Sequence, residues 1–328
     1  MKHVTFLKRF ANQLVKKNWV DIENEYYKFL RSFLDDTHQY ANPAILNNEL
    51  DFIKFKLIEY LTLIQKSQIQ DLPLNNNIRQ NIFSPFVARD ISVSAEEVWV
   101  NFIKKRIDSS HAWWEVLLGN YYENDIFDRY HQIELFKCKY QKQIKDFGVR
   151  SVPEGEFPEE FLLPDRIMLL NFNYTYTADA YLHRNEYFKT NHIHGELLNP
   201  ESIIFGYGDE LDEGYKKLLK LDENEYLQNI KSIKYLESSN YRDMLSFIES
   251  APYQVCIMGH SCGNSDRTLL NTLFEHKNCV SIKPFYYQKE EGEDNYLEIV
   301  QNICRNFTDM QLMRDKVVNK TFCTPLDS

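Results

Sequence analysis

Cys256-Ile257-Met258-Gly259-His260-Ser261-Cys262-Gly263-Asn264-Ser265-Asp266 is the stretch that decides the fold class of this chain. Its first three residues end an apolar run that starts at Tyr253. A glycine-bounded turn follows the run and leads into an apolar helical pattern at 265–277. The run is continuously apolar rather than alternating, which predicts a strand covered on both faces, as in a parallel sheet. A strand, a turn and a helix in this order are typical of α/β domains.

Similar patterns surround this stretch. Apolar runs of strand type lie at 167–172, 202–205 and 280–285, and further helical patterns lie at 212–249 and 294–305. Strand and helix therefore alternate over the second half of the chain. We expect residues 151–328 to form an α/β domain with a mostly parallel, Rossmann-like sheet.

Residues 1–150 predict a large helical region instead. Apolar side chains recur there at helical spacing, and all ten glycines of the chain lie between Gly119 and Gly292. Ser94 and Glu97 have the spacing of a capping box, which predicts a helix start. The Asn- and Pro-rich segment 71–85 predicts a loop. Proline, glycine and acidic residues at 152–158 mark the boundary between the two regions.

Composition excludes several classes of protein. The 328 residues carry a formal net charge of -10, so the basic footprint of a general DNA-binding protein is missing. Apolar runs are far too short to span a membrane, and the amino terminus has no export signal, so we expect a cytoplasmic protein. The six cysteines include no C-x-x-C pair, and we expect reduced thiols, most of them buried.

Polar side chains follow the apolar run at 167–172. If strand alternation continues past the run, Asn171 and Asn173 lie on one face. Ligands of open α/β sheets bind at the carboxyl ends of strands, where two amides could orient a sugar hydroxyl or a water molecule. Asn and Thr residues in this position also suit turn and cap hydrogen bonds. Both interpretations remain open on the pattern alone.

A histidine pair forms the second candidate motif, in Asn191-His192-Ile193-His194-Gly195. Alternation in a strand places His192 and His194 on one side. A histidine with a pKa near neutrality can remove a proton from a ribose hydroxyl or from water. Gly195 permits a close backbone approach or a sharp turn. A purely structural role for the two imidazoles is the alternative.

The turn after the run at 253–258 is the third candidate. Free backbone N–H groups at a turn and a helix amino terminus can bind an anion, which points to Gly259, His260 and Ser261 as ligand contacts. Asp266 or Asn264 could instead simply cap the following helix.

In their order and spacing, these motifs resemble the AbiH-like family of bacteriophage abortive-infection proteins. The resemblance covers roughly residues 165 to 310 and includes Ile203-Ile204-Phe205-Gly206-Tyr207-Gly208-Asp209, while Asn18 to Glu23 fits a less specific part. More remotely, the constellation is similar to the sirtuin fold and its antiphage relatives. In these, an Asn at a strand end and the His of a following H-G motif act on NAD.

The resemblance implies a function in antiphage defence and specific roles for the motif residues. Asn173 would orient the ribose and a water molecule, and His194 would be the base. Asp266 would order the loop or cap the following helix. Further contacts with the nucleotide would come from residues near the strand ends: Asn171, Thr175, Gly195, Gly259, His260 and Ser261. The substrate would be NAD, cleaved to nicotinamide and ADP-ribose.

Three features depart from the sirtuin pattern. Thr175 stands where the strand-end motif has Asp. No glycine precedes Gly119, so the phosphate loop that follows the first strand in both families is missing, and the chain is either truncated or binds its ligand differently. The absence of C-x-x-C pairs argues against a zinc-containing protein deacetylase.

Two alternative functions follow from the residues. His192 and His194 could be metal ligands in a hydrolase, with His260, Asp266, Asp209 or Cys262 completing the site, although the acids at 209–213 fit a solvated loop better. The chain could also be a non-catalytic module that binds a nucleotide or a phage component, or that forms homo-oligomers through its helical half. We expect the aromatic pairs at 113–114 and 121–122 to lie in the core.

Overall fold

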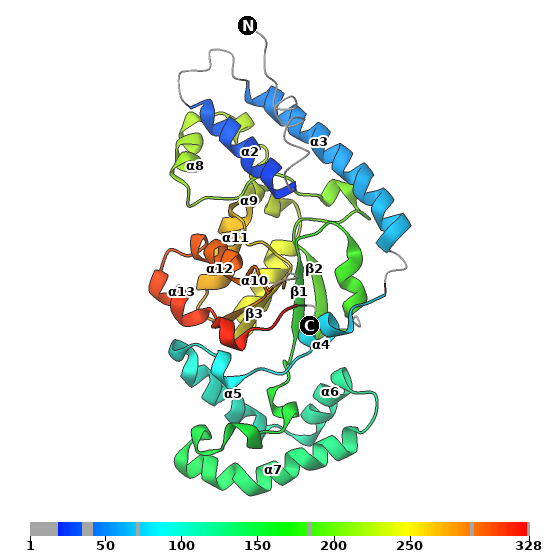
Figure 1. The fold of residues 1–328 in the computed structure, drawn as a ribbon, viewed down its shortest axis with the longest axis vertical. Coiled ribbons are helices and arrows are strands. Elements are labelled where there is room, and N and C mark those ends of the chain that lie inside the picture. Colours follow the sequence, from blue (N-terminus) through cyan, green and yellow to red (C-terminus); the bar gives the residue numbers. More distant parts are fainter. Residues whose placement is uncertain (1–18, 35–41, 70–72, 183–184, 289–291, 327–328) are drawn as a thin grey trace.

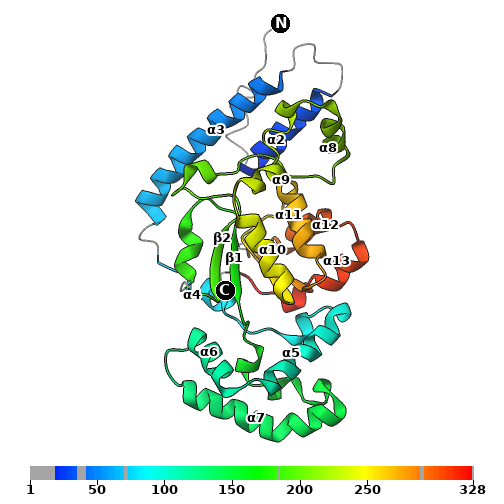
Figure 2. The same cartoon turned by 180° about the vertical axis from the view of Figure 1, so that it is seen from behind.

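The computed structural model describes residues 19–34, 42–69, 73–182, 185–288 and 292–326. The molecule is elongated: an amino-terminal helix pair lies at one end, a second group of helices lies at the other, and the strands lie between them (Figures 1 and 2). The helices before the first strand are α2 (Trp19–Ser32), α3 (Pro43–Ile64), α4 (Asn76–Ile82), α5 (Glu96–Asp108), α6 (His111–Tyr121) and α7 (Ile126–Phe147).

The second half contains both strands and helices, as the sequence predicts, although only a 3₁₀ helix separates β1 from β2. The strands are β1 (Ile167–Asn171), β2 (Phe188–His192), β3 (Tyr253–Met258) and β4 (Cys279–Phe285). The helices of this half are α8 (Glu213–Leu218), α9 (Lys231–Lys234), α10 (Asn240–Ser250), α11 (Arg267–Glu275), α12 (Tyr296–Arg305) and α13 (Met310–Lys316). The fold is therefore mixed α/β and mainly helical.

The expected single Rossmann-like sheet is not present among the described residues. β1 pairs in parallel with β2, β3 pairs in parallel with β4, and each pair is a separate two-stranded sheet. The run at 202–205 was expected to add a strand, and this prediction is wrong. Ser202 ends a 3₁₀ turn, and 203–205 are buried without pairing to a strand. Apolar character alone did not distinguish a buried connection from a strand.

Local signals in the amino-terminal half were partly misleading. α5 starts at Glu96 and has no side-chain cap, because Ser94 lies in a preceding 3₁₀ turn. The segment 71–85 is not entirely loop, since it contains α4, whose first turn is capped by the side chain of Asn75. The cap of α3 follows the usual rule: Oδ1 of Asn42 accepts a hydrogen bond from the backbone N–H of Ala44, and Pro43 occupies the first turn.

Separate apolar clusters hold the parts together. One cluster joins α10, α11 and α12 to β3 and β4. A second joins α2 and α3 to the segment 205–226, so the amino-terminal helices pack on the α/β half. A third joins α5, α6 and α7 to 149–163 and contains the buried Trp114, with Trp113, Tyr121 and Tyr122 packed against it. The expectation that these aromatic pairs contribute to the core is confirmed.

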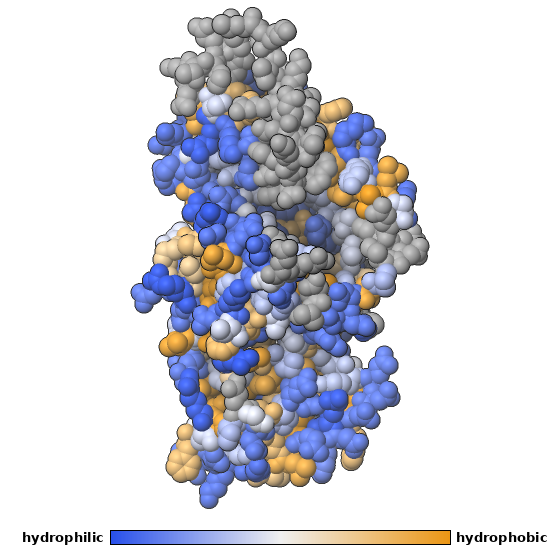
Figure 3. Space-filling model, viewed as in Figure 1, coloured by the Kyte–Doolittle hydropathy of each residue, from blue (hydrophilic) through white to orange (hydrophobic). Residues whose placement is uncertain are grey.

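Apolar side chains also reach the surface along α3. Ile45, Phe52 and Leu63 lie on one face of this helix and are about half exposed or more. Orange side chains are visible in this region at the upper right of the space-filling view (Figure 3). Within the described part of the chain, no helix combines the length and the apolar character needed to cross a membrane.

Candidate functional site

The carboxyl ends of β1, β2 and β3 meet in one region. The ring of Phe172, directly after β1, lies 4.1 Å from the ring of His260, which follows β3. The same Phe172 ring lies 5.3 Å from that of His194, which follows β2. The three sequence motifs therefore come together, although their strands belong to two sheets. This edge is where ligands bind in open α/β folds.

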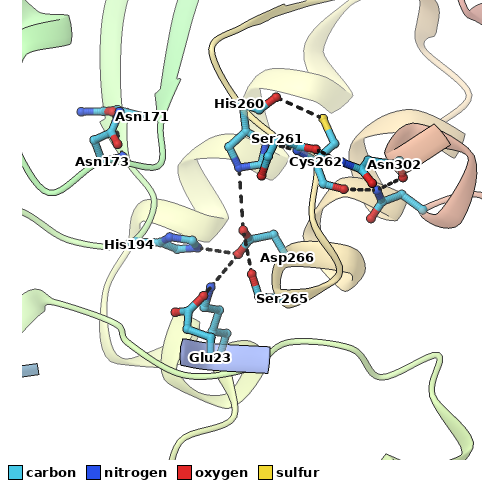
Figure 4. Close-up of polar contacts among 12 residues, drawn as sticks. Glu23, Asn171, Asn173, His194, His260, Ser261, Cys262, Ser265, Asp266 and Asn302 are labelled. Atoms are coloured by element: carbon cyan, nitrogen blue, oxygen red, sulfur yellow. Dashed lines mark hydrogen bonds and ion pairs between the residues drawn. The ribbon is translucent and has the colours of Figure 1, made fainter. Parts of the chain in front are cut away.

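His194 forms a buried pair with Asp266 (Figure 4). Nε2 of His194 lies 3.2 Å from Oδ1 of Asp266 and 3.2 Å from the hydroxyl of Tyr235. Burial and the nearby Lys231 ammonium lower the pKa of His194 below its ordinary value, outweighing the carboxylate. The lowered pKa favours the neutral imidazole, and the carboxylate facing Nε2 favours the tautomer with its proton on that nitrogen. Nδ1 has no hydrogen-bond partner among the described residues and is left as the basic nitrogen.

Asp266 is also part of a buried ionic cluster. Nζ of Lys231 lies 2.8 Å from Oδ1 of Asp266 and 2.9 Å from Oε2 of Glu23. Burial disfavours the charged Lys231, but the two carboxylates raise its pKa above the ordinary value. Burial acts against ionised Asp266 as well, yet Lys231 and His194 hold the pKa of Asp266 well below its usual range. For Glu23 burial dominates, and the pKa is raised.

Of the two roles expected for Asp266, the structure contradicts the helix cap. Asp266 directly precedes α11, but its side chain makes no capping hydrogen bond. Its carboxylate points instead to His194, Lys231 and His260, whose Nε2 lies 3.7 Å from Oδ2. Asp266 is buried, and its carboxylate contacts both histidines.

The turn after β3 provides the exposed part of this region. Gly259 has a φ of +74° and is exposed, as is Ser261. Nδ1 of His260 accepts a hydrogen bond from the backbone N–H of Cys262, which fixes the ring, and the Ser261 carbonyl accepts one from Nδ2 of Asn302. Gly259, His260 and Ser261 therefore form a polar rim over the buried pair.

Asn171 and Asn173 do not share a face, because β1 ends at Asn171. Oδ1 of Asn171 accepts a hydrogen bond from the backbone N–H of Asn173, and Nδ2 of Asn171 donates to the carbonyl of Thr175. This is the turn interpretation that the sequence left open. Asn173 is exposed, and in Figure 4 the two Asn side chains lie apart from the contacts between His194 and Asp266. The hydroxyl of Thr175 contacts that of Thr177 at 3.3 Å.

The two histidines of the H-x-H motif have different partners, because β2 ends at His192. Nε2 of His192 lies 2.8 Å from Oδ2 of Asp179, and its Nδ1 lies 3.3 Å from Nδ2 of Asn171. His194 turns to Asp266 instead. Asp209, expected in a solvated loop, is buried and lies 3.3 Å from Arg267. Within the described ranges, no three ligand-type side chains converge to hold a metal ion.

Gly195 makes the close backbone approach that the sequence predicted. Its φ is +83°, and a Cβ atom there would collide with the carbonyl group of Ser202. This contact packs the residues after His194 against the segment that leads to Ile203. The turn at Gly195 thereby fixes the backbone of His194.

The comparison with protein families identifies the chain. The model of the family described as "Bacteriophage abortive infection AbiH" matches residues 2–288. The chain belongs to the AbiH family. No curated protein and no solved structure matches it.

In this AbiH chain, sequence reasoning missed three residues of the site. Glu23, Lys231 and Tyr235 all contact the pair of His194 and Asp266 or its ionic cluster. Glu23 and Lys231 are 208 positions apart, and no local pattern links them. A charged residue at an otherwise apolar helix position was the available signal, as for Glu23 beside Ile22 and Tyr26.

Two large cavities in the AbiH chain lie away from this pair. One of about 880 Å³ lies between the strands and the helices α5 and α6. The other, of about 950 Å³, lies near Arg89, Arg150 and Lys283. Neither is lined by His194 or Asn173.

Proposed function

We propose that this chain acts in antiphage abortive infection by binding NAD over the polar rim and hydrolysing its nicotinamide–ribose bond. The observation that carries the proposal is His194, a neutral imidazole held through Nε2 by Asp266 with Nδ1 unpaired. A base oriented by a carboxylate is the arrangement of general base catalysis. The family match supports the defence role.

The proposed reaction consumes one water molecule. Water adds to the anomeric carbon of the ribose, and the bond to nicotinamide breaks with its electron pair on the nicotinamide nitrogen. The water proton passes to Nδ1 of His194. Asn173, exposed in the turn after β1, orients the water or the ribose, while Gly259, His260 and Ser261 contact the nucleotide. Asn171 and Thr175 support the turn that carries Asn173.

The test is incubation of the purified chain with NAD, followed by quantification of nicotinamide and ADP-ribose. We expect product with the wild type and loss of at least about a hundredfold in kcat for His194→Ala, the usual contribution of a general base. His131→Ala is the matched control, because His131 is exposed on α7. Equal rates for the wild type and His194→Ala would refute the proposal, as would the absence of product from both.

A second candidate is binding without turnover. It is favoured by the burial of His194. In that case NAD raises the melting temperature of the chain without forming product. Plaque counts with cells that express the wild type or His194→Ala then show whether defence depends on this residue.

A further inference from the structure

We propose that an extended apolar segment of a partner polypeptide inserts as a parallel β-strand between β1 and β3, and joins the two small sheets into one. The inference is independent of nucleotide hydrolysis. It rests on the two strand edges, the cavity between them and the direction in which the strands run.

Both strands have an open edge. β1 pairs only with β2, and β3 only with β4, among the described residues. The backbone N–H of Ile167 donates to Tyr187, and the carbonyl of Asn171 accepts from Ile193, so these residues face β2. Because successive peptide groups alternate, those of Met168 and Leu170 face the other way. An edge of this kind is a template for an added strand.

The open edges face one cavity. The cavity of about 880 Å³ is lined by Met168 and Leu169 from β1 and by Gln254, Cys256 and Met258 from β3. Trp99 and Phe102 of α5 also line it. Most of this lining is apolar. Since the lining comes from both strands, the cavity adjoins β1 and β3 together.

The two strands run in the same direction. Their carboxyl ends meet at the rings of Phe172 and His260, and their first residues, Ile167 and Tyr253, line the same cavity. A strand placed parallel between them can form ladders on both sides. Neighbouring strands in a sheet lie about 4.8 Å apart. A row of N–H and C=O groups on each wall suits a peptide backbone better than a small molecule, and peptide recognition by strand addition works in this way.

Cys256 is accessible at this cavity. It lies in the middle of β3, where a parallel sheet is normally covered, yet it is exposed. The middle residues of β1 are likewise only partly buried. The inserted strand would cover both and would end near Gly259, next to the polar rim.

The probe for the test is a synthetic peptide with a valine–isoleucine run as long as β3, six residues, flanked by lysines for solubility. Hydrogen exchange measured by NMR and the rate of Cys256 alkylation are followed with and without peptide. We expect exchange of the amides of Met168, Leu170 and Gln254 to slow by at least about tenfold. Alkylation of Cys256 slows as well, whereas that of Cys138, exposed on α7, does not change.

The matched variants are Cys256→Asp and Cys138→Asp. Cys256→Asp places a charge in the apolar position and should abolish the peptide-induced protection of the edge amides. Cys138→Asp should retain this protection. Circular dichroism checks that both variants fold. The wild-type alkylation measurement does not depend on either variant. The proposal is overturned if saturating peptide gives no protection of the edge amides, or if a peptide with proline in its run protects them equally well. It is also overturned if the edge amides are already protected in a self-associated chain. That result would assign the two edges to a second copy of the chain.

Discussion

Nε2 of His194 and Oδ1 of Asp266 lie 3.2 Å apart, and both side chains are almost completely buried. The contact joins a residue after β2 to one just before α11. Since Lys231 contacts the same carboxylate oxygen, the charge of Asp266 is shared between an ammonium and an imidazole. Stability and proton binding at this site are therefore linked.

Removing the ammonium of Lys231 should destabilise the fold strongly. Lys231→Met leaves Glu23 and Asp266 buried without their cation, and breaking a buried ionic cluster from one side costs about 3–5 kcal/mol. Lys234→Met is the control in the same helix: its pair with Glu237 is partly exposed, and we expect a loss below about 1 kcal/mol. Urea unfolding measures both, and equal losses would contradict the role of the cluster.

Stability should also fall in mildly acidic solution. His194 has a folded pKa below its ordinary value of 6.5, so the unfolded chain binds the proton more readily. The contribution of neutral His194 to the free energy of unfolding is complete above pH 6.5. It is lost as the pH falls through the pKa of His194 in the folded chain. Asp266 acts in a lower window, because its pKa lies well below 3.8. The free energy of unfolding, measured from pH 8 to pH 5, should decrease less for His194→Phe than for the wild type. Parallel curves would exclude His194 as the cause.

The glycines of the site should differ in their tolerance of alanine. Gly195→Ala combines a strained φ of +83° with a collision against Ser202, and we expect a loss of about 3 kcal/mol or more. Gly259→Ala has a similar φ of +74° but no atom within 4 Å of the added Cβ, so about 1–2 kcal/mol is expected. Melting temperatures of the two variants measure the difference. Equal losses at the two positions would mean that strain, rather than packing, dominates.

The sequence predicted the parts of the fold that depend on local pattern. Continuous apolar runs located β1, β3 and β4, and the glycine-bounded turn located the rim. The pairing of strands could not be predicted from the sequence, because apolar character does not specify which strand edges form hydrogen bonds. The prediction that β1 continues past Asn171 was also wrong. The side chain of Asn171 accepts a hydrogen bond from the backbone N–H of Asn173 and ends the strand.

In the site, too, local sequence patterns predicted individual residues but not their tertiary contacts. His194 and Asp266 were identified from their motifs, and chain folding brings them together. Their interaction was not foreseen, because capping explained Asp266 locally. Glu23 and Lys231 entered the site only through tertiary packing.

The two histidines of the motif should differ in function. Both ring nitrogens of His192 are occupied, Nε2 by Asp179 and Nδ1 by Asn171, so His192 has no nitrogen free to accept a proton from water. Nδ1 of His194 has no partner among the described side chains. His192→Ala should therefore lower the melting temperature but leave kcat for NAD hydrolysis within about threefold of the wild type, whereas His194→Ala should lower kcat by at least about a hundredfold.

A spectroscopic measurement can test this difference without activity. Long-range ¹⁵N–¹H NMR correlations distinguish the two neutral tautomers, and we expect a proton on Nε2 of both rings, since each Nε2 faces a carboxylate. On addition of NAD, the Nδ1 shift of His194 should change while that of His192 stays constant. A change confined to His192 would transfer the proposed base to the pair of His192 and Asp179. In that case the buried cluster around Asp266 would serve stability alone.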